Sequence, residues 1–298
     1  MWTKMRRCFV VLFCLLSCFG AFSQNWESVK ADNTLIWGEG WGSSVDEADQ
    51  QALSSLVSKI TIAVVNDFQQ VEQQVLSSQG NEHYLMQSNR SSAYSNVTLS
   101  NTHRVVLKSG RKSHVGRWIR RADLEVIFAD RKSRILEYEQ SALYAEQAGR
   151  LDDALRYHYW AYVLLRSLQR PSELRSDDGR MLLNSIPERI STILDDLDVR
   201  MSSHYNDVVK LNFTYRGRPV GGLDFTYFDG ARWSPVTSVR SGQASLDMAP
   251  GALAETIQLR VEYAYRGDSL MDGELFDTMN VLNLKPIRKS FISFKTRN

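Results

Sequence analysis

The chain has 298 residues, with 36 Lys and Arg against 34 Asp and Glu, 43% hydrophobic residues, 17 Gly and 6 Pro. This length predicts about two domains, and the composition excludes a disordered polymer and a collagen-like or low-complexity chain. The near-balance of charge argues against a nucleic-acid partner, which would call for a strongly basic surface.

The first 23 residues have the pattern of a secretory leader. A cluster of cations precedes an apolar run at 8–18, and Ala21-Phe22-Ser23 favours cleavage before Gln24. The apolar run is too short to span a bilayer, so we expect a mature chain that begins at Gln24 and has no transmembrane span. The alternative is a lipid anchor at Cys18, because the residues before it loosely resemble a lipoprotein cleavage motif.

Removal of this leader would leave 275 of the 298 residues, with 33 basic and 34 acidic side chains and no cysteine. Such a chain has no disulfide, no thiol nucleophile and no zinc–thiolate site. Its stability outside the cytoplasm must come from apolar burial, which a chain of this length can supply. We expect an exported protein that is periplasmic or associated with the outer membrane, with secretion as the alternative.

Residues 24–130 are expected to form a small α+β domain that begins with a strand and a helix. The strand at 35–37 ends in a tight turn, Gly38-Glu39-Gly40-Trp41-Gly42, and Ser44 with Glu47 has the spacing of a capping box. An apolar stripe at helical spacing follows, and the alternation at 60–64 then predicts a strand. The stripe consists of Val45, Ala48, Ala52, Leu53, Leu56, Val57 and Ile60.

A polar connection is expected at 77–92, followed by two strands at 94–107 and 116–128 that are joined by a turn at 109–111. This order predicts one helix packed on a mostly antiparallel sheet.

The glycine-rich strand end and the Ala and Leu repeat that follows resemble the LPP-twenty family of small bacterial envelope lipoproteins. The residues that carry this resemblance are Ile36-Trp37-Gly38-Glu39-Gly40, Ala48, Ala52, Leu53, Leu56, Ile60 and Ile62. The N-terminal domain of the flagellar T-ring assembly protein is similar. The resemblance covers about residues 33–130 and implies an exported, outer-membrane-associated protein without established catalytic residues.

Residues 131–205 are expected to be helical. Helices at 135–148 and 152–168 are separated at Gly149, which suits the left-handed position at a helix end. This pair resembles one tetratricopeptide helix pair, whose small residues match Gly149, Ala154 and Ala161, but an array would need about three units. A third helix is expected from a capping box at Ser185 to Met201.

Residues 206–298 change to a period of two. Short alternating segments at 209–213, 223–228, 243–248, 257–265 and 287–294 are separated by turns, among them Arg216-Gly217-Arg218-Pro219 and Ser241-Gly242. Strands at this spacing predict an antiparallel, Ig-like β-sandwich without the cysteine pair of true immunoglobulin domains. The complete fold prediction is α+β: a small antiparallel sheet with one helix, a helical hairpin region and a C-terminal sandwich.

The sequence offers no catalytic, cofactor-binding or metal-binding motif. None of the five histidines has a second histidine at ligand spacing, and no nucleophile elbow is present. His158 lies among aromatic residues on a helix, where packing or hydrogen bonding explains it better than catalysis. The carboxylates Asp195, Asp196 and Asp198 are interpreted as the solvated side of a helix.

Three features are candidate interaction surfaces. The first is a basic hairpin with Arg111 and Lys112 at its tip and Arg117 on a strand. It could contact anionic lipid headgroups or another acidic surface, or it could be a solvated edge that prevents strand-to-strand aggregation. The second is Trp37 and Trp41 beside Glu39, an arrangement that a sugar-binding groove also uses. The third is the helix face that carries Tyr157 and Tyr159.

These observations predict a non-enzymatic envelope protein that acts as an interaction or assembly component. We expect one or more envelope protein partners, with association to the outer membrane or the cell wall. One alternative is a peptidoglycan- or carbohydrate-binding module. The other is an envelope glycan hydrolase, which would need two acidic side chains converging in a groove.

Overall fold

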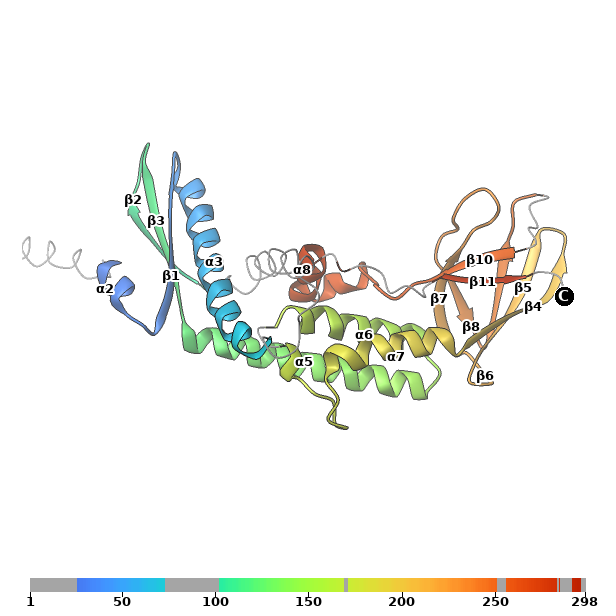
Figure 1. Cartoon of the computed structure of the whole chain (residues 1–298). Coiled ribbons are helices and arrows are strands. Elements are labelled where there is room, and N and C mark those ends of the chain that lie inside the picture. The colour runs from blue at the N-terminus through green and yellow to red at the C-terminus, as the bar shows by residue number, and fades with distance from the viewer. Residues whose placement is uncertain are drawn as a thin grey trace, which may run out of the picture. The chain divides into compact units, whose positions relative to one another are not determined.

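The computed structural model describes residues 26–72, 102–168, 171–250, 256–282, 284 and 291–295 (Figure 1). The predicted leader and the polar connection at 77–92 therefore lie outside the described residues. The chain divides into two compact units, of which the first contains residues 1–63 and 99–125 and the second contains 64–98 and 126–298. None of the described helices is both long and apolar enough to cross a membrane.

The first unit contains a three-stranded antiparallel sheet with strand order β1-β3-β2 (Figure 1). Helix α3 packs on one face of this sheet, and Trp26 of the short helix α2 packs on the other face against Gly116. The elements are α2 (Trp26–Ala31), β1 (Leu35–Gly42), α3 (Val45–Glu72, of which residues 45–63 belong to this unit), β2 (His103–Lys108) and β3 (Ser113–Arg120). The expected small antiparallel sheet with a packed helix is confirmed.

The glycine-rich segment 38–42 is part of strand β1, so the predicted tight turn is wrong. Gly38 and Gly40 face α3, and a Cβ atom at Gly38 would lie 2.3 Å from the backbone nitrogen of Leu56. The glycines are required because the helix backbone lies directly on the strand. Their pattern indicates close packing of two elements rather than a change of chain direction.

Helix α3 begins at the predicted capping residue but extends further than expected. The Ser44 hydroxyl accepts a hydrogen bond from the Glu47 backbone N–H at 3.2 Å, and the Glu47 carboxylate accepts one from the Ser43 N–H at 2.7 Å. The strand predicted at 60–64 is wrong, because the helix continues to Glu72. Ile60 is buried one turn after Leu56 and belongs to the helical stripe.

The strand predicted at 116–128 is also wrong beyond Arg120, because α5 (Arg121–Gln147) begins there. Leu124, Phe128 and Ile135 are buried at helical spacing, with Arg131 buried between them. A buried arginine within the apolar stripe concealed this helical period from the sequence pattern.

The helices of the second unit are α5 from Val126 onward, α6 (Leu151–Arg166) and α7 (Leu182–Asp195). Gly149 has a φ of 72° and separates α5 from α6 as predicted. The third helix ends at Asp195 instead of Met201, because β4 (Leu197–Tyr205) starts immediately afterwards. Buried Leu197 and Val199 alternate with exposed residues, which is the period of a strand.

The C-terminal strands form one antiparallel sheet of eight strands that curls into a half-barrel (Figure 1). The expected two-sheet, Ig-like sandwich is not confirmed. Alternation in the sequence predicts that each strand has one buried face, but it does not show whether a second sheet or the curl of the same sheet covers that face. The strands that follow β4 are β5 (Val208–Tyr215), β6 (Arg218–Pro219), β7 (Gly222–Tyr227), β8 (Thr237–Arg240), β9 (Gln243–Asp247), β10 (Thr256–Val261) and β11 (Phe291–Lys295).

Between β10 and β11 the chain leaves the sheet and returns to the helices. It forms a 3-10 helix, η3 (Asp268–Met271), and a short helix, α8 (Gly273–Leu282), which packs on α6. No helix is predicted in this segment from the sequence. Its position on the helices creates the groove described next.

Candidate functional site

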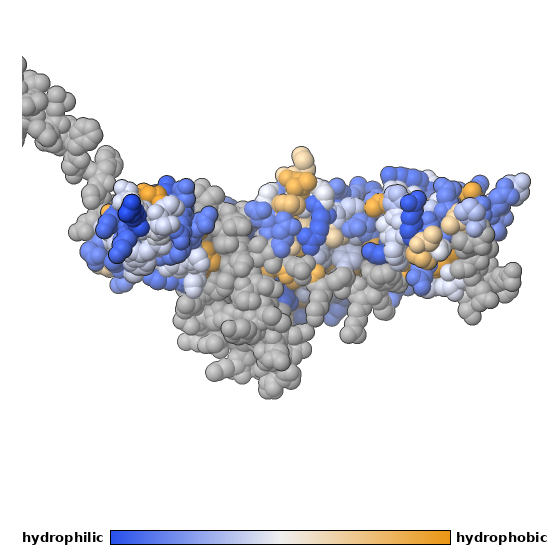
Figure 2. All heavy atoms as spheres, turned by 90° about the horizontal axis from the view of Figure 1, so that it is seen from above, coloured by the Kyte–Doolittle hydropathy of each residue, from blue (hydrophilic) through white to orange (hydrophobic). Residues whose placement is uncertain are grey.

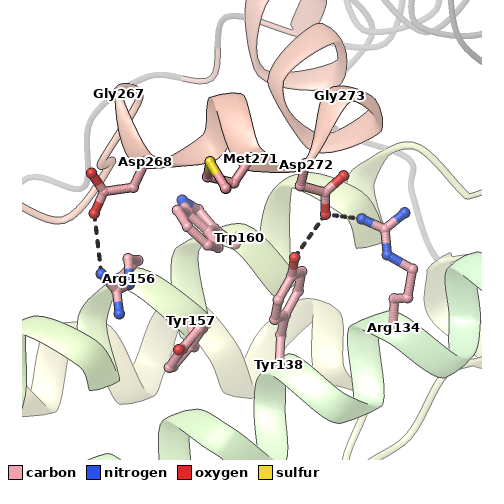
Figure 3. A pocket seen from close by; sticks show the side chains of 10 residues that line it. All are labelled: Arg134, Tyr138, Arg156, Tyr157, Trp160, Gly267, Asp268, Met271, Asp272 and Gly273. Carbon is pink, nitrogen blue, oxygen red and sulfur yellow. Dashed lines mark hydrogen bonds and ion pairs between the residues drawn. The ribbon is translucent and has the colours of Figure 1, made fainter.

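A groove of about 1030 Å³ lies between α5, α6 and the η3–α8 segment (Figure 3). Its floor is aromatic. The ring centroids of Tyr138 on α5 and Tyr157 on α6 lie 5.9 Å apart with an interplanar angle of 16°, and Trp160 meets both rings edge-on at 5.8 and 6.0 Å. The Trp160 indole N–H donates to the Ala264 carbonyl at 3.0 Å, which fixes the ring.

One end of the groove is closed by Asp272. Its carboxylate forms an ion pair with Arg134 and accepts a hydrogen bond of 2.8 Å from the Tyr138 hydroxyl (Figure 3). Burial would raise the pKa of Asp272, but the hydrogen bonds from Arg134, the Leu275 N–H and Tyr138 outweigh it and keep this pKa below its ordinary value. Burial and the contact with Asp272 raise the pKa of Tyr138 to about 12.

A second contact continues this closure on α8. The Glu274 carboxylate pairs with both Arg131 and Arg134 of α5. The Arg131 side chain is fully buried, and its guanidinium also donates to the Ser167 hydroxyl at 3.0 Å. A buried guanidinium needs such partners, so these ion pairs hold the start of α8 on α5.

The other end of the groove is formed by Arg156. Its guanidinium donates to Asp268 at 3.1 Å (Figure 3). It also lies over the rings of Tyr157 and Tyr265, at 4.9 and 5.4 Å from their centroids. A smaller hollow of about 600 Å³ adjoins it around Asp224 and Tyr265. Tyr265 has a φ of 45°, and its hydroxyl donates to Asp224 at 3.2 Å.

A hydrophobic side chain at the edge of the groove is strongly exposed. Met271 lines the groove, is 94% exposed and extends above Trp160 (Figure 3), and its neighbour on η3, Leu270, is 62% exposed. Figure 2 shows hydrophobic residues reaching the surface over the η3–α8 segment. The arrangement is an aromatic surface with an apolar rim, flanked by charges that already have partners within the protein.

The described residues contain no group of three or more His, Cys, Asp or Glu side chains that could hold a metal ion. His158 is buried, and its Nδ1 lies 2.8 Å from the Glu139 carboxylate. Asp195, Asp196 and Asp198 are exposed, as the sequence analysis expected, although Asp198 lies on β4.

The predicted aromatic helix face is divided between groove and core. Tyr157 lies in the groove, whereas Tyr159 is buried and meets Tyr263 edge-on at 5.0 Å. Burial raises the pKa of Tyr159 to about 12.

Trp37 and Trp41 lie on the face of the small sheet opposite α3. Trp37 meets Trp26 edge-on at 6.0 Å, and the Lys59 ammonium lies 3.0 Å from its ring centroid. Trp41 is 55% exposed and stacks on His114 at 4.6 Å.

Glu39, between these tryptophans, is engaged within the protein. Its carboxylate accepts hydrogen bonds from the Trp26 indole and from Lys30, the latter at 3.0 Å. Burial alone would raise the pKa of Glu39, but these donors lower it overall. The groups that bind Glu39 directly are donors and cations, and Lys30 bridges it to the exposed carboxylate of Glu27, also at 3.0 Å.

The basic hairpin residues differ in their surroundings. Arg111 and Lys112 are exposed in the turn between β2 and β3. Arg117 points toward α3, where its guanidinium binds the two carboxylate oxygens of Asp49 at 2.7 and 2.9 Å. Its side chain is only 17% exposed.

Sequence reasoning missed Arg134, Tyr138, Asp272 and Met271, because it did not predict the η3–α8 segment. Leu275, Met279 and Leu282 are buried at helical spacing, and Asp272 accepts the Leu275 N–H at 3.1 Å as a helix cap. This cap and stripe were the available indications of α8.

Comparisons with protein-family models, with curated proteins and with solved structures gave no match.

Proposed function

We propose that this chain is an exported interaction or assembly component of a bacterial cell envelope, at the periplasm or the outer membrane. The leader-like N-terminus and the LPP-twenty resemblance support this location. The groove is its main contact surface. The observation that carries this assignment is the exposed pair Leu270 and Met271 beside an aromatic floor.

Exposed hydrophobic groups of this kind are typical of contact surfaces. Methionine adapts its shape to a partner, and aromatic residues provide much of the binding energy at interfaces. The charged groups that line the groove are paired within the protein, Arg134 with Asp272 and Arg156 with Asp268. These ion pairs fix the shape of the surface, as a binding surface requires.

The test is site-specific photo-crosslinking in intact cells, with the crosslinker at position 271 or, as a control, at position 144. Tyr144 is 62% exposed on α5 and lies outside the groove lining. We expect an envelope protein to crosslink at 271 only, and Tyr157→Ala to weaken its binding to the purified partner. Equal crosslinking at both positions would contradict the assignment of the groove.

A carbohydrate-binding module is the second candidate, and the flat stack of Tyr138 and Tyr157 favours it. Aromatic faces beside fixed polar groups provide both apolar contact and hydrogen bonding for a sugar ring. Sedimentation of the purified protein with cell wall tests this alternative. Retention without any protein partner, lost in Tyr157→Ala, would favour sugar binding over assembly.

A further inference from the structure

One end of the small sheet brings together an exposed tryptophan and several cations. In the β1–β3 register Trp41 is opposite His114, and in the β2–β3 register Lys108 is opposite the same His114. Residues that are opposite each other in a sheet share a face. Trp41, His114 and Lys108 therefore form a row on the face opposite α3, next to the turn that carries Arg111 and Lys112.

The tryptophan of this row is held in place without being covered. The Trp41 and His114 rings stack with centroids 4.6 Å apart and an interplanar angle of 12°, yet Trp41 remains 55% exposed. A large aromatic side chain that is exposed but already fixed loses little conformational entropy when it inserts into an apolar or interfacial environment.

The cations at this end have no partners within the described part of the chain. Lys108, Arg111 and Lys112 are exposed, and no ion pair or hydrogen bond of their side chains occurs among those residues. The hairpin cations further from the turn are paired: Arg117 binds Asp49, and Arg120 binds Asp123.

The carboxylate of Glu39 lies on the same face, 3.6 Å from His114 Nε2, and it is only 13% exposed and paired with Lys30 at 3.0 Å. Other described carboxylates belong to the start of α3. Asp46 is exposed there, and the Glu47 carboxylate accepts hydrogen bonds from Ser43. Helix α3 packs on the sheet face that carries Gly38 and Gly40, whereas Trp41 is on the other face. Because Glu39 is already engaged by Lys30 and Trp26, the exposed cations at the tip have no carboxylate partner among the described residues.

We propose that this sheet tip, formed by Trp41, Lys108, Arg111 and Lys112, docks on the surface of a bilayer that contains anionic phospholipid. Tryptophan is favoured at the level of the lipid headgroups, and each Lys or Arg near an anionic surface adds a modest, salt-sensitive attraction. Stable attachment takes two such contributions acting together. The proposal is independent of the groove, which lies in the other unit.

The test is sedimentation of the protein that begins at Gln24 with vesicles of phosphatidylcholine, with and without phosphatidylglycerol. We expect binding only when phosphatidylglycerol is present, and a decrease as salt is raised. Arg111→Gln should lower the partition coefficient about fivefold, and neutralising Lys108, Arg111 and Lys112 together should lower it on the order of a hundredfold. Trp41→Ala should weaken the binding that remains at high salt.

Arg120→Gln is the matched control. It removes the same charge from the other end of β3, roughly 25 Å from Arg111 at the rise of a strand and beyond the screening length of about 8 Å at physiological salt. Binding by this variant should stay within about twofold of the unmodified protein. Equal losses in Arg111→Gln and Arg120→Gln would overturn the proposal, as would equal binding to both kinds of vesicle or to neither.

Discussion

Gly40 of β1 lies against the helix backbone at Ala48: a Cβ atom on Gly40 would be 2.1 Å from the Ala48 carbonyl oxygen. Ala48 itself is fully buried. The strand and helix therefore meet through their smallest residues, with no side chain between the two backbones. The same contact occurs two residues earlier in the strand, where a Cβ atom on Gly38 would be 2.5 Å from the Ala52 carbonyl oxygen.

Gly40→Ala should destabilise the first unit by about 3 kcal/mol, at the upper end of overpacking costs because backbone rather than a flexible side chain must move. Hydrogen exchange at the amides of β1 and α3 would measure the loss. Gly267→Ala is the control, because Gly267 has helical backbone angles and no atom within 4 Å of its Cβ position. Equal protection in Gly40→Ala and the unmodified protein would show that the helix does not rest on the strand.

The buried pair of Glu139 and His158 should be important for the stability of the helices. Glu139→Ala leaves the His158 ring without its 2.8 Å partner in an apolar site, and the expected cost is about 3 kcal/mol. Urea unfolding monitored by circular dichroism would measure it. Asp198→Ala, which removes an exposed ion pair with Arg200, should cost less than about 1 kcal/mol.

Replacing both partners distinguishes a lost pair from a cavity. The double variant Glu139→Leu/His158→Leu should recover most of the stability lost in Glu139→Ala, because two apolar groups replace the buried pair. Arg189, which lies 3.8 Å from Glu139, keeps Glu146 as a partner at 4.0 Å. Failure of the double variant to recover stability would indicate that shape, rather than pairing, determines this site.

The predictions from sequence succeeded where the determining contacts are local. The turns at 216–217 and 241–242 were recognised, and all four residues have positive φ angles of 49° to 78°. The buried stripe of α3 followed from its period alone. Helix capping at Ser44 was likewise visible, because hydroxyl and N–H are three residues apart.

Predictions failed where a distant segment determines the structure. The glycines of β1 were interpreted as a turn because their reason is a helix that packs on them. Arg131 interrupted the apolar stripe of α5, and its partner Glu274 is 143 positions away. The groove depends on Arg134 and Asp272, 138 positions apart, a pairing that no local pattern contains.

Alkaline unfolding should report on buried Tyr159. Its pKa is raised from 10.0 to about 12 by burial, so the folded protein keeps a proton that the unfolded chain loses above pH 10. The stability contributed by the neutral hydroxyl is fully present below pH 10 and is lost as the pH rises to about 12. In Tyr159→Phe the fall in unfolding free energy over this window should be smaller by about 2 kcal/mol. If the unfolding free energies of Tyr159→Phe and of the unmodified protein, measured by urea titration, fell equally over this window, the burial of this hydroxyl would be contradicted.

Asp272 should hold the η3–α8 segment on α5. Asp272→Asn keeps an oxygen to accept the Leu275 N–H but loses the charge that pairs with Arg134, and the expected cost is about 2 kcal/mol at neutral pH. Amides of α8 should then exchange faster. Asp268→Asn, whose carboxylate side chain is 55% exposed, should cost less than about 1 kcal/mol.

The ion pair of Asp272 with Arg134 also makes the unfolding free energy depend on pH in a predictable direction. Because the folded-state pKa of Asp272 lies below its ordinary value of 3.8, its contribution to stability is present above pH 3.8 and is lost as the pH falls through the lowered pKa. The unfolding free energies of the unmodified protein and of Asp272→Asn should therefore differ at pH 7 and converge in acid. A difference that persists at low pH would mean that the introduced amide disturbs packing, and that the ion pair with Arg134 does not hold the groove closed at this end.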